Sequence, residues 1–152
     1  DLRYIDPETN ERYLPYVIEP SVGVERLFLA VLCDAYERQV LENGTEREVL
    51  HLIPALAPFK ATILPLVKKV HSQKANEIYS DLLRDFYVSY DDAGSIGKRY
   101  RRCDAIGVPF CITVDDETIN DNIVTVRNRD TMTQEKVKVS DLKEYIKNAV
   151  KF

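Results

Sequence analysis

One stretch of the sequence, "DDAGSIGKRYRR" at Asp91–Arg102, concentrates cations at a predicted helix start. Four positive side chains lie within five residues, at Lys98, Arg99, Arg101 and Arg102. The stretch follows an apolar run, and free N–H groups at the start of a helix favour anions. Tyr100, between the cations, could stack on a nucleic-acid base. The alternative is a solvated helix face, since runs of charge usually lie at the surface.

A second stretch, "TVRNRD" at Thr125–Asp130, places two arginines on alternate positions of a predicted strand. Arg127 and Arg129 should therefore point to the same face of the sheet. Guanidinium groups suit phosphates and base edges because their planar fork donates paired hydrogen bonds. The alternative is ordinary cross-strand pairing with Glu117 or Glu135.

A third stretch, "EPSVGVERLFLAVLCDAY", combines an acid before a turn with an arginine in a helix. Glu19 could bind a small ammonium group, and Arg26 could hold a polyphosphate. The alternative is a core helix capped by Ser21, with both charges solvated. His51 and His71 stand apart, so neither a metal site nor a nucleophile–histidine set is indicated.

Composition excludes several classes of protein. The chain has 152 residues, 45% of them hydrophobic, and a formal charge of -4, so an anionic partner needs a local basic patch. Its three cysteines form no C-x-x-C pair, which favours reduced thiols in the cytoplasm. No apolar run approaches the ~20 residues of a membrane span, so no membrane partner is expected. The chain starts without Met, which we interpret as a piece of a longer polypeptide.

The elements that must position these residues fall into two parts, residues 1–45 and 46–152. In the first part, Asp1–Tyr16 is predicted to form a hairpin. The apolar spacing from Val22 to about Leu41 is helical, with Ser21 as N-cap and Gly44 at the stop. We place the domain boundary in the polar linker "GTERE".

The second part is predicted to be an α/β domain. Apolar, β-branched runs alternate with helical patterns in the order βαβαβ, followed by two hairpin-linked strands and a final helix capped by Ser140. Crossover helices make the first three strands parallel, and short connections make the next two antiparallel. The expected strands are "KATILPLV", "YVSY", "VPFCITV", "IVTVRNR" and "EKVKV", the helices are 74–86, 95–107 and 140–150, and "DDETINDN" is a turn. The result is a mixed five-stranded sheet with helices on its faces.

These stretches together resemble a known enzyme family. The third stretch is similar to motif 3 of class II aminoacyl-tRNA synthetases, in the form found in homodimeric glycyl-tRNA synthetases. "VLHLIPALAPFKATILPLVKK", "DDAGSIGKRYRRCDAIGVPFCITVD" and "VTVRNRDTM" resemble the anticodon-binding domain at the C-terminus of that enzyme. The resemblance covers nearly the whole chain. It implies a three-layer α/β/α anticodon-binding domain preceded by a remnant of the catalytic domain.

The resemblance also implies roles for individual residues. Arg26 is the expected contact to ATP phosphate, and Glu19 and Ser21 are expected to help hold the amino group of glycine. The parent enzyme is expected to be a homodimer that uses ATP and Mg²⁺ to activate glycine and transfers it to tRNA. Motifs 1 and 2 are not found, so this chain alone is predicted to be inactive, with no cofactor and no metal.

For the second part, the resemblance implies that the tRNA(Gly) anticodon is the partner. The positions that match the family's anticodon contacts are Ser95, Lys98, Arg99, Glu117, Arg127 and Arg129. Arg127 is the first expectation for reading a base, and Glu117 could accept from a cytosine amino group. The rival hypothesis is a stand-alone paralogue of the anticodon domain, an RNA-binding accessory subunit without ligase activity.

Overall fold

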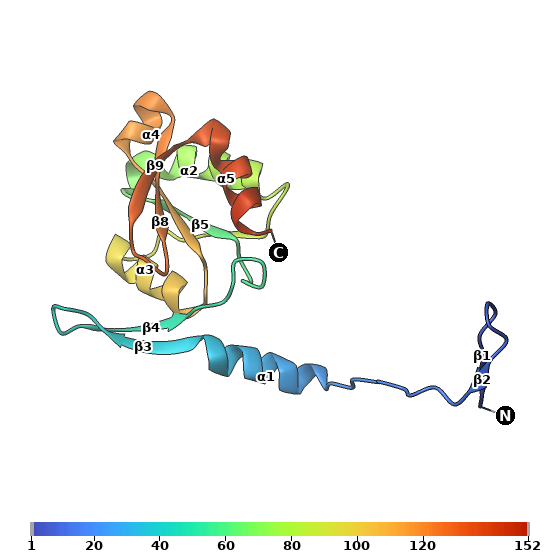
Figure 1. The fold of residues 1–152 in the computed structure, drawn as a ribbon. Helices are drawn as coiled ribbons and strands as arrows, with labels where there is room; N and C mark the ends of the chain where they lie inside the picture. Colours follow the sequence, from blue (N-terminus) through green and yellow to red (C-terminus); the bar gives the residue numbers. More distant parts are fainter. Residues whose placement is uncertain (1, 152) are drawn as a thin grey trace.

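The computed structural model describes residues 2–151, and a mixed five-stranded sheet forms its core (Figure 1). The strands are β5 (Ala61–Pro65), β6 (Val88–Tyr90), β7 (Phe110–Val114), β8 (Ile123–Asn128) and β9 (Gln134–Lys138), in the spatial order β6-β5-β7-β8-β9. β5 pairs in parallel with β6 and β7, whereas β7–β8 and β8–β9 are antiparallel. The predicted strand order along the chain and the predicted directions are confirmed.

Helices cover both faces of this sheet, which gives the three layers expected. α2 (Lys68–Leu82) and α5 (Leu142–Ala149) pack on one face, and α3 (Ile96–Ala105) lies on the other (Figure 1). Neighbouring residues of β5 show the division, because Ile63 belongs to the cluster with α2 and α5, and Leu64 to the cluster with α3. Successive side chains of a strand point to opposite faces, so a strand buried on both faces is apolar throughout.

Three local predictions in this domain were wrong. The turn predicted at 115–122 contains a helix, α4 (Asp116–Asp121), which a capping box between Asp115 and Thr118 stabilises. α2 starts at Lys68, six residues before the predicted start. Ser140 does not cap the last helix, because it lies inside a 3₁₀ turn, η1 (Val139–Asp141), that precedes α5.

The N-terminal part projects away from the sheet (Figure 1). The predicted hairpin is confirmed as β1 (Tyr4–Ile5) and β2 (Arg12–Tyr13), and an extended segment joins it to α1 (Val24–Ala35). Ser21 does not cap this helix, because the chain stays extended for two more residues. Gly23 occupies the N-cap position, and no side chain caps the helix there.

A second hairpin replaces the predicted end of α1 and the predicted linker. β3 (Tyr36–Val40) pairs with β4 (Glu46–Leu50), and Gly44, with φ of +76°, lies in the connecting turn. Gly44 thus takes the left-handed conformation expected of it, but in a strand-to-strand turn. The boundary proposed between residues 45 and 46 falls within this hairpin and stays a prediction.

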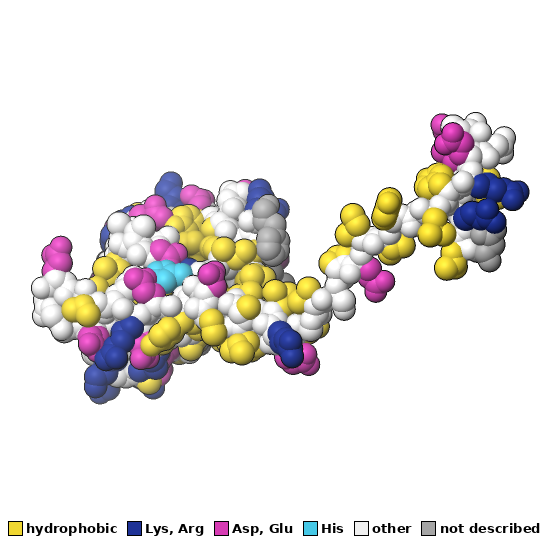
Figure 2. All heavy atoms as spheres, turned by 60° about the horizontal axis from the view of Figure 1, so that its bottom comes forward, with side chains coloured by type: hydrophobic (Ala, Val, Ile, Leu, Met, Phe, Trp, Pro, Cys, Tyr) yellow, Lys and Arg dark blue, Asp and Glu magenta, His cyan; other side chains and the backbone are white. Residues whose placement is uncertain are grey.

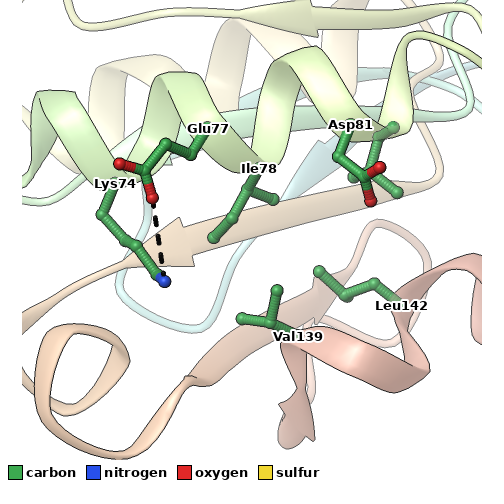
Figure 3. Close-up of a pocket in the computed structure, with 7 residues that line it drawn as sticks. Lys74, Glu77, Ile78, Asp81, Val139 and Leu142 are labelled. Carbon is green, nitrogen blue, oxygen red and sulfur yellow. Dashed lines mark ion pairs between the residues drawn. The ribbon is translucent and has the colours of Figure 1, made fainter.

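Two hollows lie beside the helices. An apolar groove of about 590 Å³ runs between α1 and residues 50–58, and hydrophobic side chains continue along α1 and the extended segment (Figure 2). A small cleft of about 130 Å³ lies between α2 and the start of α5, where Lys74 stands 3.9 Å from Glu77 (Figure 3). This cleft is on the face of the sheet opposite α3. No helix in residues 2–151 is long and apolar enough to cross a membrane.

Candidate functional site

The carboxyl ends of the parallel strands meet at one edge of the sheet, where α2, α3 and α4 all begin. Ligands of open α/β sheets bind at this edge. Arg99 of α3 organises it from inside, with 4% of its surface exposed. Its Nη1 donates to the carbonyl of Pro65 at 2.6 Å, and its Nε and Nη2 donate to the carbonyl of Gly94 at 3.1 and 2.7 Å. Arg99 therefore ties the loop before α3 to the end of β5.

Ser95 and Lys98 lie on the outer side of the same edge, and both are exposed. Ser95 occupies the N-cap position of α3, but its side chain makes no capping hydrogen bond. Gly94 takes a φ of +77°, which turns the chain sharply into the helix. The first turn of α3 is thus presented to solvent with a hydroxyl and an ammonium group, as an anion or a base edge would require.

Glu117 reaches this edge from α4. Its carboxylate accepts a hydrogen bond from Lys136, which raises the pKa of that lysine, and 39% of the Glu117 side chain stays exposed. His71, 1% exposed, joins α2 to α4. Its Nδ1 accepts from the Val67 amide at 2.9 Å, so its Nε2 carries the proton and donates to Asp116 at 3.0 Å.

Arg127 lies in the interior, on the α3 face of the sheet. Its Nη1 and Nη2 donate to the two carboxylate oxygens of Asp104, at 2.8 and 3.1 Å. Its guanidinium carbon lies 4.8 Å from the centre of the Tyr100 ring. Burial lowers the pKa of Arg127, but the hydrogen bond and charge of Asp104 outweigh burial and raise it overall.

Asp104 has a second arginine partner that the sequence did not indicate. Arg47 of β4 donates from Nη1 to Asp104 at 3.0 Å. The side chains of Arg47, Asp104 and Arg127 are 1%, 0% and 8% exposed. The suggested pairing of Arg127 with Glu117 or Glu135 was wrong, because the carboxylate that Arg127 pairs with is that of Asp104.

Arg129 is also buried, with 2% of its surface exposed, and it lies one residue beyond the end of β8. It donates to the carbonyls of Gly107 and Leu52 at 2.9 and 2.8 Å, and to the carboxylate of Asp130 at 2.8 and 2.9 Å. The contact with Leu52 joins the end of β8 to the segment that follows β4.

The six residues expected to bind RNA therefore form two groups along α3. Ser95, Lys98, Arg99 and Glu117 lie at the edge where α3 begins. Arg127 and Arg129 lie toward its other end, since Arg127 pairs with Cys111 in register and the Arg129 amide donates to Pro109. A helix of ten residues spans roughly 15 Å.

The remaining cations of α3 contribute to the structure. Arg101 donates to the carbonyl of Glu46 and to the hydroxyl of Thr45, at 2.8 and 3.2 Å. Arg102 pairs with Asp91 at 2.5 Å. Burial raises the pKa of Asp91, but hydrogen bonds from the Ala93 amide and Arg102 outweigh burial and lower it overall. Three of the four cations in this run, Arg99, Arg101 and Arg102, therefore bind groups of the protein, and Lys98 is exposed. Solvation of the whole run as one face is not observed.

The residues expected to hold ATP and glycine lie in the N-terminal part. Glu19, Ser21 and Arg26 are all exposed. The groove beside α1 is lined by apolar side chains and includes none of the three. Their roles stay predictions.

Comparisons with known proteins show the family to which the chain belongs. Over all 152 residues the chain is 57% identical to a glycine--tRNA ligase of Clostridium kluyveri and 56% identical to one of Bacillus cereus, and it spans 33% of the length of each. A solved structure described as the RNA binding domain of threonyl-tRNA synthetase from Cryptosporidium parvum is similar, with a TM-score of 0.60 and 26% identity, over 65% of this chain and 25% of that one. A family model described as an anticodon binding domain matches residues 60–149, so the chain belongs to the anticodon-binding-domain family.

Proposed function

We propose that this chain is the tRNA-anticodon-binding part of a glycine--tRNA ligase, together with the motif 3 segment of its catalytic domain. The match of residues 60–149 to an anticodon binding domain carries the proposal. Similarity to glycine--tRNA ligases over all 152 residues of this chain supports glycine as the amino acid, and it does not favour a stand-alone paralogue. A cytoplasmic location, suggested by three unpaired cysteines, belongs to the same proposal.

The tRNA(Gly) anticodon is proposed to lie along α3 and to contact both ends of it. Single-stranded RNA bases are recognised by hydrogen bonds to their edges and by stacking. The exposed first turn of α3 supports direct contacts from Ser95 and Lys98, and the partly exposed carboxylate supports a contact from Glu117. Arg127 is proposed to read a base at the other end of α3. Arg99 and Arg129 are proposed to hold the protein backbone around these contacts, through their hydrogen bonds to carbonyl groups.

The catalytic roles belong to the parent enzyme. We propose that Arg26 binds ATP phosphate and that Glu19 and Ser21 bind the glycine amino group, once the rest of the catalytic domain surrounds them. A guanidinium suits a triphosphate and a carboxylate suits an ammonium group. This chain alone is proposed to form no adenylate. Glycine-dependent ATP–pyrophosphate exchange by the 152-residue chain would refute that statement.

The anticodon proposal is tested by binding to two RNA hairpins. One carries a glycine anticodon, and the other differs in a single anticodon base. We expect Lys98→Ala to weaken binding to both hairpins alike and to lower the salt dependence by about one phosphate contact. Arg127→Ala should instead reduce discrimination between them. Lys147→Ala is the control, because Lys147 is exposed on α5, across the sheet from α3.

Equal affinity of the unmodified chain for the two hairpins would contradict the proposed function. A loss of affinity in the Lys147 variant as large as in the Lys98 variant would contradict the placement of the RNA along α3.

A further inference from the structure

The hairpin β3–β4 and the two residues after it, residues 36–52, form a strap that lies outside the part of the chain matched by the family model. The strap is bound to the end of β8 at three points. Both terminal nitrogens of Arg47 donate to the Arg129 carbonyl at 3.2 Å, and the Leu52 carbonyl accepts from Arg129 at 2.8 Å. His51 Nδ1 lies 2.6 Å from the Asp130 carboxylate. The strap therefore holds the stretch in which Arg127 lies.

The charges in this contact do not balance. Asp104 is one carboxylate shared by two guanidinium groups, and all three side chains are at most 8% exposed. One anion cannot neutralise two cations, and in a buried site a residual charge is only weakly screened. The cluster of Arg47, Asp104 and Arg127 therefore keeps one unbalanced positive charge.

The two arginines differ in how they are held. Arg47 is 1% exposed, and it also donates to the Gln39 side chain at 2.6 Å and to the Arg129 carbonyl. Arg127 is the more exposed of the two, and its contacts with Asp104 use two of the five N–H donors of a guanidinium. Arg127 is therefore the one of the two arginines with N–H donors left for a ligand.

We propose that Arg47 is a positioning residue for anticodon recognition. Because Arg47 shares the carboxylate of Asp104, the charge of Arg127 is only partly neutralised. Arg127 can then attract a hydrogen-bond acceptor on a base more strongly. The inference rests on the proposed function, because it assigns Arg127 the role of reading a base. A neutral side chain at position 47 would leave Arg127 and Asp104 as a balanced pair, with less affinity for that acceptor.

The test uses the 152-residue chain and the two RNA hairpins that differ in one anticodon base. Arg47→Met is expected to reduce discrimination between them by about tenfold, the lower range for one paired contact between a side chain and a base. Arg127→Ala should reduce it by at least as much, and the double variant by no more than Arg127→Ala alone. Arg47→Lys should regain most of the discrimination because it keeps the charge. Arg38→Met is the control, since Arg38 lies in the same hairpin with 62% of its side chain exposed.

Different outcomes refute the inference and the proposed function. If Arg47→Met discriminates as well as the unmodified chain while Arg127→Ala does not, Arg47 has no positioning role and the proposed function stands. A folded Arg47→Lys variant that discriminates no better than Arg47→Met also overturns the inference. If the unmodified chain does not discriminate at all, both proposals fail. Arg47→Gln, which keeps a donor without the charge, replaces Arg47→Met if the latter does not unfold cooperatively.

Discussion

Asp104→Asn should destabilise the domain far more than any other single change in the buried charge cluster. The carboxylate accepts three hydrogen bonds, one from Arg47 at 3.0 Å and two from Arg127 at 2.8 and 3.1 Å. An asparagine in its place leaves two buried guanidinium groups without a counter-charge and turns an amide N–H₂ toward one of them. Removing one partner of a buried ion pair typically costs about 3–5 kcal/mol. The free energy of unfolding of a typical domain is about 5–15 kcal/mol, so this loss is a large share of the total stability.

Arg47→Met should cost much less than Asp104→Asn. After this change Asp104 still pairs with Arg127, and the buried charges become equal in number. The change removes the hydrogen bonds to Asp104, to the Gln39 side chain and to the Arg129 carbonyl, but it also removes the surplus buried cation, so we expect a net loss of about 1–2 kcal/mol. Asp92→Asn is a control, since Asp92 pairs at 3.0 Å with a Lys68 side chain that is 67% exposed, and such pairs contribute about 0–1 kcal/mol.

Urea denaturation, followed by far-UV circular dichroism, measures all three free energies of unfolding. Cooperative transitions with similar m-values are required for the comparison. An Asp104→Asn variant that loses less than about 1 kcal/mol would refute the view that the carboxylate compensates two buried cations. An Arg47→Met variant as unstable as Asp104→Asn would show that geometry, and not the count of charges, governs the cluster.

Three further predictions concern the backbone, acid stability and thiols. Gly107→Ala should cost about 1–3 kcal/mol in urea denaturation, since φ is +79° and a Cβ would stand 3.0 Å from Leu52. Gly97→Ala should raise the free energy of unfolding by at most about 1 kcal/mol, because Gly97 lies in α3 with open space around a Cβ. Burial raises the pKa of Asp130, but hydrogen bonds and charges of Arg129 and His51 outweigh burial and lower that pKa below 3.8. The ionised carboxylate therefore contributes stability above pH 3.8, and this contribution is lost as the pH falls below that value. Unfolding free energies measured against pH should lack this acid-dependent loss in Asp130→Asn. Native labelling with a thiol reagent should modify Cys33 quickly and the two buried cysteines only after unfolding.

The sheet could be predicted from the sequence because its central strands are buried on both faces. β5 and β7 are continuous apolar or β-branched runs, and every residue in each is buried. The hairpin β3–β4 could not be predicted in the same way. Tyr36 and Val40 are four residues apart and continue the helical spacing of α1, so local periodicity favours a longer helix. The segment forms a hairpin instead, because β4 packs against α3 and Arg101 donates to the Glu46 carbonyl.

The candidate site shows a similar division between local and distant information. The sequence identifies Lys98 and Ser95 as parts of an exposed helix start because their setting is local. It does not show that Arg99 and Arg129 satisfy backbone carbonyls in the interior. It also does not reveal Arg47, whose partners lie 57 and 82 residues further along the chain. Side chains that complete such long-range contacts carry no periodic signal.

The burial of arginines changes how this domain can attract RNA. Four arginines are buried in residues 2–151, at positions 47, 99, 127 and 129, against a single buried acid, Asp104. The chain has a formal charge of -4, so its outer surface is more negative than that value suggests. General attraction to a polyanion is therefore weak, and contacts to phosphates depend on local groups of cations. Under the proposed function, binding depends on a small number of oriented groups, Lys98 at one end of α3 and Arg127 toward the other. Such an arrangement favours discrimination between anticodons over affinity for RNA in general, because contacts to bases carry sequence information and contacts to phosphates do not.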